Sequence, residues 1–229
     1  MRYECEQVEL KRKDDGTDLY LTKFWCPASW QDKNILMVHG LTYTQHVFDI
    51  KYKDYSVCEY FAKNGYTVWR LDLSGYGKSG KYEDGWKVTT QHAAEDEIYA
   101  LEKICELQGV EKLDLLGWSW GTMTTSKVAS QRPDLLKKVV WLGPCFGGAF
   151  EATPVTELHR MWVDHTYAQD GGHGRPNGGA KEIMEIGDGW LIDTKAVKLL
   201  HLHGAGHAMY LEKDYYQTTR EAILKFISE

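Results

Sequence analysis

The stretch Gly117-Trp118-Ser119-Trp120-Gly121 follows an apolar run at residues 113–116, and this pattern decides the fold class. A serine between two glycines, at a sharp turn from a strand into a helix, is held in a strained backbone conformation with its hydroxyl aimed outward. The glycines give that turn clearance because they carry no side chain. A helix-forming stretch follows at residues 122–131. The pattern therefore predicts a nucleophile elbow, the strand-turn-helix unit that presents a reactive serine.

Length and composition limit the fold and its partners. At 229 residues the chain is long enough to bury the core of one α/β domain, and we expect a single domain over residues 1–229. The net charge is -6, and Lys and Arg are scattered along the chain. This charge argues against nucleic acid or an anionic membrane as the main partner. A small-molecule substrate fits the composition better.

The cysteines and the first residues predict a location in the cytoplasm. The five cysteines form no C-x-x-C pair, and their odd number argues against a disulfide framework or a zinc ribbon. Residues 1–15 are dense in charge and contain no apolar signal core. No run approaches the roughly 20 apolar residues of a membrane span. We therefore expect reduced thiols and a soluble protein without a membrane span.

Extended segments alternate with helical ones along the chain, which is typical of a mostly parallel sheet covered by helices. Two opening runs flank the turn Asp14-Asp15-Gly16 and predict an antiparallel hairpin. After it, apolar strands alternate with helices in the pattern of a doubly wound α/β fold. The expected strands are 3–10, 19–25, 35–38, 66–71, 113–116, 139–142 and 197–202, and the expected helices are 57–63, 90–108, 122–131 and 215–227.

These features resemble the α/β-hydrolase family in its serine-nucleophile branch of esterases and lipases. Four segments occur in that family's order: His39-Gly40 after a strand, residues 72–79 (DLSGYGKS) after the next, the Ser119 pentapeptide, and residues 204–207 (GAGH). The resemblance covers residue 3 to about residue 143 and again residues 198–229. It implies the α/β-hydrolase fold, with a short irregular lid segment at about residues 144–195 inserted in the domain.

The resemblance also points to a base and an oxyanion hole. A serine hydroxyl is a weak nucleophile, and an imidazole can take its proton and later return it to the leaving group. The position of His207, in a small-residue loop before the last helix, matches the family's catalytic histidine. The backbone N–H groups of Trp120 and Leu41 should bind the charge that develops on a carbonyl oxygen. We expect His39 itself to hold its loop by hydrogen bonds.

The third member of the triad is left open by the sequence. The family order of serine, acid and histidine requires a carboxylate between Ser119 and His207. Residues 182–189 (EIMEIGDG) come nearest to the family's Gly-Asp-x-Asp pattern, and Asp188 is therefore the leading candidate. The alternatives, in order, are Asp193, then Asp164 or Asp170, and lastly Glu151 after the sixth strand.

The stretch between Gly143 and His207 has two interpretations. These residues can form a lid. Because they would also have to supply one strand and helix of the usual family core, the alternative is that the chain lacks that strand and helix. Its aromatic residues either line an acyl pocket or pack a lid onto the sheet, and the free energy of burial does not distinguish these roles. The pocket candidates are Phe146, Phe150, Trp162, Tyr167 and Trp190, and from these we select Phe146, Trp162 and Trp190.

Three other motifs are only partial. Residues 75–80 (GYGKSG) fit the dinucleotide pattern G-x-G-x-x-G after a strand, but a polar turn follows instead of a helix. A P-loop is excluded because Asp72 stands where its first glycine must be. His201, His203 and His207 have the spacing of metal ligands, although two histidines on one strand face are more simply structural. We expect no cofactor and no metal.

These observations predict a cytoplasmic serine hydrolase that cleaves carboxylic esters of small or medium size. Ser119 attacks the carbonyl, His207 acts as base and then as acid, and water clears the acyl-enzyme. A serine nucleophile disfavours the dehalogenases and epoxide hydrolases of this fold, which attack with a carboxylate. The same residues would serve a thioesterase, a lactonase or a carbon–carbon bond hydrolase. Because loss of the acid costs about four orders of magnitude in a serine triad, the alternative of a different class is a ligand-binding or sensing module.

Overall fold

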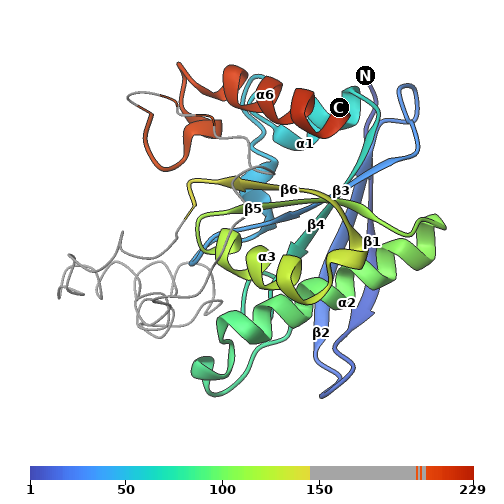
Figure 1. Cartoon of the computed structure of the whole chain (residues 1–229), viewed down its shortest axis with the longest axis vertical. Coiled ribbons are helices and arrows are strands. Elements are labelled where there is room, and N and C mark those ends of the chain that lie inside the picture. Colours follow the sequence, from blue (N-terminus) through green and yellow to red (C-terminus); the bar gives the residue numbers. More distant parts are fainter. Residues whose placement is uncertain (145–199, 201, 203–204) are drawn as a thin grey trace.

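The described residues of the computed structural model, 1–144, 200, 202 and 205–229, form one sheet with helices on both faces (Figure 1). Helices α1 and α6 cover one face, and α2 and α3 cover the other (Figure 1). The strands are β1 (Glu4–Lys11), β2 (Asp18–Trp25), β3 (Lys33–Val38), β4 (Tyr66–Asp72), β5 (Leu113–Trp118) and β6 (Leu136–Leu142). The helices are α1 (Val57–Lys63), α2 (Thr90–Gln108), α3 (Trp120–Gln131) and α6 (Tyr216–Ser228).

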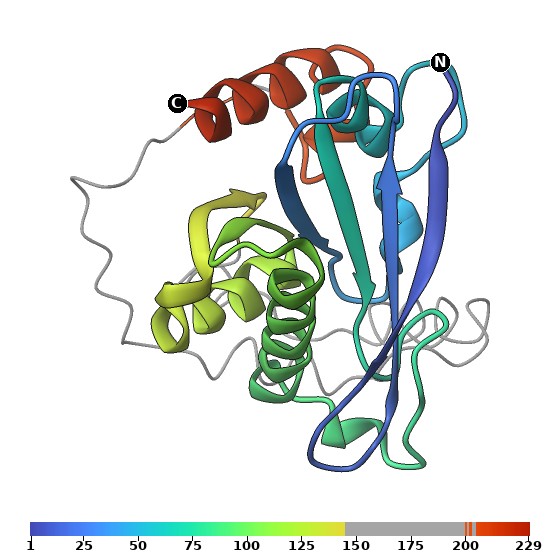
Figure 2. The same cartoon turned by 90° about the vertical axis from the view of Figure 1, so that its right-hand side faces the viewer.

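The strand order in the sheet is β1-β2-β4-β3-β5-β6. Strands β1 and β2 form the predicted antiparallel hairpin, which runs along one edge of the sheet (Figure 2). Strand β2 pairs antiparallel with β4, and the remaining pairs are parallel. The chain moves from β3 outward to β4 and then returns to place β5 on the other side of β3. In such sheets ligands bind at the carboxyl ends of the strands where the order reverses, here between β3 and β5.

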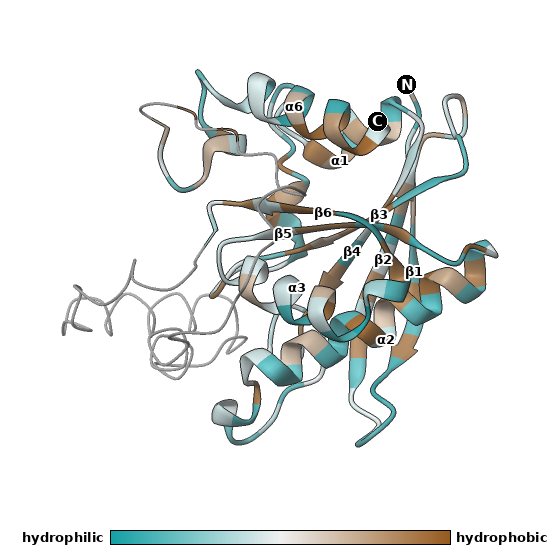
Figure 3. Ribbon diagram, in the orientation of Figure 1, coloured by the Kyte–Doolittle hydropathy of each residue, from teal (hydrophilic) through white to brown (hydrophobic). Residues whose placement is uncertain are grey.

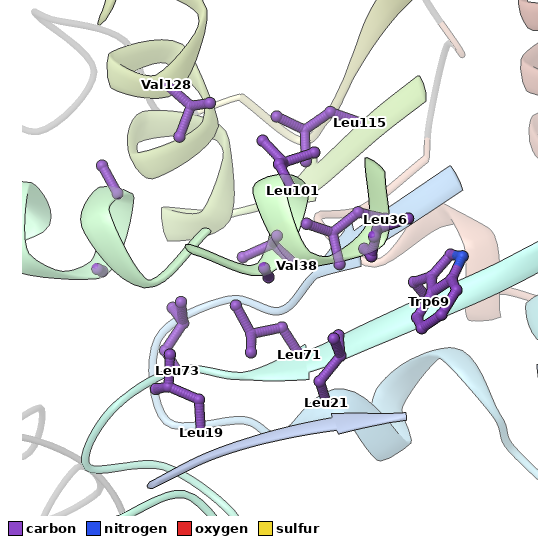
Figure 4. Packing of buried hydrophobic residues seen from close by; sticks show 14 of the residues in the cluster. Leu19, Leu21, Leu36, Val38, Trp69, Leu71, Leu73, Leu101, Leu115 and Val128 are labelled. Atoms are coloured by element: carbon purple, nitrogen blue, oxygen red, sulfur yellow. The ribbon is translucent and has the colours of Figure 1, made fainter. Parts of the chain in front are cut away.

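Apolar side chains pack on both faces of the sheet, which is why the strands read as continuous hydrophobic runs. All residues of β4 and β5 are buried. On one face, Leu36 and Val38 of β3 pack with Leu115 of β5 against Leu101 of α2 and Val128 of α3 (Figure 4). A second buried cluster joins the opposite face to α1 and α6. Apolar residues accordingly concentrate in the strands, and polar residues face outward on the helices (Figure 3).

Local signals set the ends of α1 and α2, which have the predicted bounds, whereas α3 begins two residues earlier than predicted and α6 is shifted by one residue. The Ser56 hydroxyl accepts a hydrogen bond from the Glu59 N–H at 3.0 Å and caps α1. The Thr89 hydroxyl caps α2 in the same way, at 3.1 Å from the His92 nitrogen. Helix α2 ends where Gly109 takes a left-handed conformation with φ 64°. These ends fix where the loops at the carboxyl edge of the sheet begin.

The α/β-hydrolase fold is thus confirmed for the described residues within the resemblance, 3–143 and 205–229. The expected lid at about residues 144–195 lies outside the described residues, as does most of the expected strand at 197–202. The alternative of a missing strand and helix therefore stays a prediction. Within the described ranges, no helix is long and apolar enough to cross a membrane.

Candidate active site

Ser119 occupies the turn between β5 and α3 with a strained backbone. Its φ is 57° and its ψ is -124°, a region that side-chain-bearing residues rarely adopt. The Ser119 N–H donates to the Leu142 carbonyl at 3.0 Å, and the Thr122 N–H donates to the Ser119 carbonyl at 2.8 Å. Packing and hydrogen bonds therefore hold the turn. Strain of this kind is maintained only where the surrounding structure demands it, and it often marks a functional site.

The two glycines of the pentapeptide are required by close backbone contacts. A Cβ on Gly117 would lie 2.3 Å from the Gly121 carbonyl oxygen, and a Cβ on Gly121 would lie 2.7 Å from the Val38 carbonyl oxygen. Real Cβ atoms essentially never come so close. The absent side chains let the first turn of α3 approach both β5 and the end of β3, and this brings Ser119 to the carboxyl edge of the sheet.

His207 reaches Ser119 from the loop before α6. Its Nε2 lies 2.7 Å from the Ser119 Oγ, within hydrogen-bond distance. His207 is exposed among the described residues, but desolvation by the surrounding protein lowers its pKa below the ordinary value, because it disfavours the charged imidazolium. A neutral imidazole can accept the serine proton. Ser119 itself is half-buried.

The other ring nitrogen of His207 points toward the end of β6. A Cβ on Gly143, whose φ is 54°, would lie 2.9 Å from His207 Nδ1. Among the residues that the structure describes, no carboxylate forms a hydrogen bond or ion pair with His207. Every predicted acid lies outside them: Asp188, Asp193, Asp164, Asp170 and Glu151.

The loop after β3 lies against the serine. A Cβ on Gly40 would come within 2.8 Å of the Ser119 Cβ, so the backbone that leads into Leu41 lies beside Ser119. Within the described ranges, neither the Leu41 nor the Trp120 N–H donates a backbone hydrogen bond. Trp120 opens α3, where the first N–H groups of a helix have no partner in the helix. The role of these two N–H groups in an oxyanion hole stays a prediction.

His39 makes the loop contacts expected of it. Its Nδ1 lies 2.8 Å from the Gly40 carbonyl oxygen, and its Nε2 lies 3.2 Å from the Leu73 nitrogen. The Leu73 N–H donates to Nε2, so Nδ1 carries the proton and donates to Gly40. The ring is fully buried. His39 therefore ties the loop after β3 to the loop after β4.

The glycine-rich segment after β4 is a structural turn. The Asp72 carboxylate accepts hydrogen bonds from the Gln45 N–H at 2.7 Å and from the Lys78 N–H at 2.9 Å. A Cβ on Gly77, whose φ is 49°, would lie 2.0 Å from that carboxylate. The segment closes on Asp72, which agrees with the rejection of both nucleotide-binding motifs. His201 and His203 lie outside the described residues.

Several residues near Ser119 and His207 were not predicted from the sequence. The Trp118 indole N–H donates to the His207 carbonyl oxygen at 3.0 Å. The Tyr43 ring, 40% exposed, meets the Trp118 ring edge-on at 4.9 Å between centroids. The Gly206 N–H donates to the Glu212 carboxylate at 3.0 Å. The predicted pocket residues Phe146, Phe150, Trp162, Tyr167 and Trp190 all lie outside the described residues.

Comparisons with known proteins agree with this fold. A family model described as "alpha/beta hydrolase fold" matches residues 33–171. Among curated proteins, Epoxide hydrolase 3 of Siraitia grosvenorii is 31% identical over 101 residues, which are 44% of this chain and 31% of that protein. The match thus spans about a third of that relative.

Solved structures show the same fold in larger proteins. Potato (Solanum tuberosum) epoxide hydrolase I superposes with a TM-score of 0.52 and 22% identity, covering 74% of this chain and 47% of that one. An epoxide hydrolase from Vigna radiata gives a TM-score of 0.51 and 20% identity, covering 71% and 47%. The aligned part spans about half of each of these proteins, and at such identities the likeness concerns the fold alone.

Proposed function

The chain belongs to the alpha/beta hydrolase fold family, and we propose that it is a cytoplasmic serine hydrolase that cleaves carboxylic esters of small or medium size through an acyl-enzyme. One observation carries the proposal: Ser119 Oγ, on a strained turn, lies 2.7 Å from His207 Nε2. A nucleophile within hydrogen-bond reach of a base is the arrangement that covalent acyl transfer needs.

The reaction proceeds in two halves. His207 Nε2 takes the Ser119 hydroxyl proton as Oγ attacks the ester carbonyl carbon, and the resulting oxyanion accepts hydrogen bonds from the Leu41 and Trp120 N–H groups. The tetrahedral intermediate collapses, the C–O bond to the alcohol breaks, and His207 gives its proton to the departing oxygen. Water, deprotonated by His207, then attacks the acyl carbon and releases the acid and Ser119.

The names of the relatives raise epoxide hydrolysis as the competing activity. Elementary chemistry separates the two activities at Ser119. A carboxylate that opens an epoxide forms an ester, and water can cleave that ester at its carbonyl. A serine hydroxyl that opened an epoxide would form an alkyl ether, which has no carbonyl for water to attack. The serine therefore supports acyl substrates, including thioesters, lactones and activated carbon–carbon bonds.

The acid of the triad belongs to the proposal, with Asp188 first among the candidates and Asp193 next. A carboxylate that accepts from His207 Nδ1 would fix the tautomer in which Nε2 faces Ser119. If no carboxylate does so, the chain would bind ligands and turn them over slowly. A ligand-binding or sensing module is thus the alternative of a different class.

The proposal is tested with p-nitrophenyl esters of short acids, a fluorophosphonate probe and styrene oxide, each with the wild type and with Ser119→Ala. We expect ester turnover and a one-probe mass increase in the wild type and neither in Ser119→Ala. Diol formation from styrene oxide would contradict the proposed chemistry. A probe adduct without ester turnover would favour the binding module.

A further inference from the structure

Trp118 is the residue directly before the nucleophile, and its side chain is directed to the base. It ends β5 and is 3% exposed. Its indole N–H donates to the His207 backbone carbonyl at 3.0 Å, and its ring centroid lies 5.7 Å from that of the imidazole. The strand that carries Ser119 therefore also holds the backbone of His207.

The same indole ring contacts the loop after β3. A Cβ on Gly40 would lie 3.1 Å from Trp118 Cε3, so the ring packs against the Gly40 backbone. Tyr43 meets the ring edge-on at 4.9 Å, and Tyr210 does so at 5.4 Å. Trp118 is thus wedged between the segment that leads into Leu41 and the segment that carries His207.

Few other hydrogen bonds hold the described part of the loop that carries His207, although Tyr210 packs in the core beside it. The Ala205 N–H donates to the Leu202 carbonyl at 3.1 Å, and the Gly206 N–H donates to Glu212 at 3.0 Å. Both bonds are local in sequence, whereas the Trp118 bond crosses 89 positions and joins this loop to β5. Among the described residues, this hydrogen bond ties the His207 backbone to the strand that bears Ser119.

We propose that Trp118 is a positioning residue, which fixes the His207 backbone relative to the Ser119 hydroxyl through its indole N–H. This inference rests on the proposed function of the same site. A misplacement of about 1 Å in reacting groups can cost on the order of 100-fold in rate. Loss of the bond should therefore lower kcat and leave KM little changed, because the substrate is not what Trp118 holds.

The test variant is Trp118→Phe, which removes the N–H and keeps an aromatic ring. Its matched control is Trp69→Phe, because the Trp69 indole N–H also donates to a buried acceptor, Asn34 Oδ1 at 3.0 Å, on a strand away from the site. Three quantities are compared: kcat and KM on p-nitrophenyl acetate, the rate of fluorophosphonate labelling, and hydrogen–deuterium exchange of residues 205–211.

We expect Trp118→Phe to lower kcat and the labelling rate about tenfold to 100-fold and to speed exchange at 205–211, with neither change in Trp69→Phe. Equal losses in both variants would reduce Trp118 to a packing role and overturn the inference, as would a rise in KM at constant kcat. If Trp118→Phe does not fold, Trp118→Met replaces it, because the flexible methionine side chain fills irregular gaps in a core. The same criteria apply to that variant. A wild type without ester turnover would refute the proposed function, but the labelling and exchange data would still decide the role of Trp118.

Discussion

Ser119 Oγ and His207 Nε2 lie 2.7 Å apart, although 88 positions separate the two residues in the chain. Ser119 comes from the turn after β5, and His207 comes from the loop before α6, so only the folded sheet brings them together. In the proposed roles of nucleophile and base, the two residues would act as one unit, because each is ineffective without the other.

The first prediction concerns that unit. Ser119→Ala and His207→Gln should each lower kcat on p-nitrophenyl acetate by about 10⁴-fold to 10⁶-fold. The double variant should be no slower than the slower single variant, since either change already removes the attack. Initial rates at saturating substrate measure this. Losses that multiply in the double variant would show that the two residues act separately.

The second prediction is the pH dependence of kcat/KM. Only neutral His207 can accept the serine proton, and desolvation lowers its pKa from the ordinary value of 6.5. Activity should therefore rise with pH along a limb of unit slope whose midpoint lies below 6.5. Stopped-flow rates between pH 4 and pH 8 measure the limb, with circular dichroism as the check on folding. A carboxylate at Nδ1, as proposed for Asp188, favours the charged imidazolium and opposes this desolvation. A midpoint above 6.5 would mean that the effect of the carboxylate is the larger of the two.

The sequence was sufficient to predict the fold because the deciding signals are local. Helices at 57–63 and 90–108 have the predicted bounds, since Ser56, Thr89 and Gly109 mark their ends in the sequence itself. Strand β6 begins at Leu136, earlier than predicted, because Lys137 and Lys138 read as polar. Exposed positions on a strand weaken the apolar pattern and blur its boundary.

The site was predictable only where it follows a motif. Ser119 and His207 lie in recognisable segments, and their juxtaposition agrees with the expectation. Trp118 and Glu212 carry no such signal, because their contacts with the His207 loop depend on how distant segments meet. From the sequence alone, a tryptophan at the end of an apolar strand is expected to be an ordinary core residue.

The third prediction concerns the glycines. Gly117→Ala should abolish fluorophosphonate labelling and cost more than the 1–3 kcal/mol that is roughly typical of overpacking, because its Cβ would strike backbone atoms of Gly121 at 2.3 Å. Gly109→Ala is the control: its φ is left-handed, at 64°, whereas that of Gly117 is not, and no atom lies within 4 Å of the added Cβ. That change should cost about 1–2 kcal/mol and leave labelling intact. Urea unfolding monitored by fluorescence measures the free energy of unfolding of both variants. Equal losses of stability in the two variants would contradict the steric argument for Gly117.

The fourth prediction identifies the acid. Asp188→Asn and Asp193→Asn are made separately, and we expect Asp188→Asn to lower kcat by about 10⁴-fold because the imidazole would lose the partner that orients it. Asp193→Asn should act mildly. A sharp loss in Asp193→Asn alone would transfer the role to Asp193. Mild effects in both would exclude the two residues and leave Asp164, Asp170 and Glu151.

The last prediction concerns a buried ion pair that joins the β1–β2 hairpin to the rest of the domain. The Arg12 side chain is fully buried, and its guanidinium donates to the Asp96 carboxylate of α2 and, at 3.0 Å, to the His92 carbonyl. Asp96 also accepts the Ser74 N–H at 2.8 Å. Even beside Arg12, burial raises the pKa of Asp96 to about 6.

Arg12→Met should destabilise the fold by about 3–5 kcal/mol at pH 8, because it leaves Asp96 buried without its cation. In this variant the pKa of Asp96 should rise further, so the Asp96 carboxyl would bind a proton on folding. The stability of the variant should therefore be greatest in mild acid and fall as pH rises. Arg12→Met with Asp96→Asn should recover much of the loss, since the amide oxygen can still accept the Ser74 N–H. Urea unfolding at pH 5 and pH 8 measures the free energies of unfolding. The control is Lys11→Ala, which breaks the exposed Lys11–Asp18 pair and should change the stability little. A double variant as unstable as Arg12→Met at pH 8 would mean that the lost packing of the arginine or its lost bonds to Asp14 and Glu95, and not the uncompensated Asp96 carboxylate, cause the destabilisation.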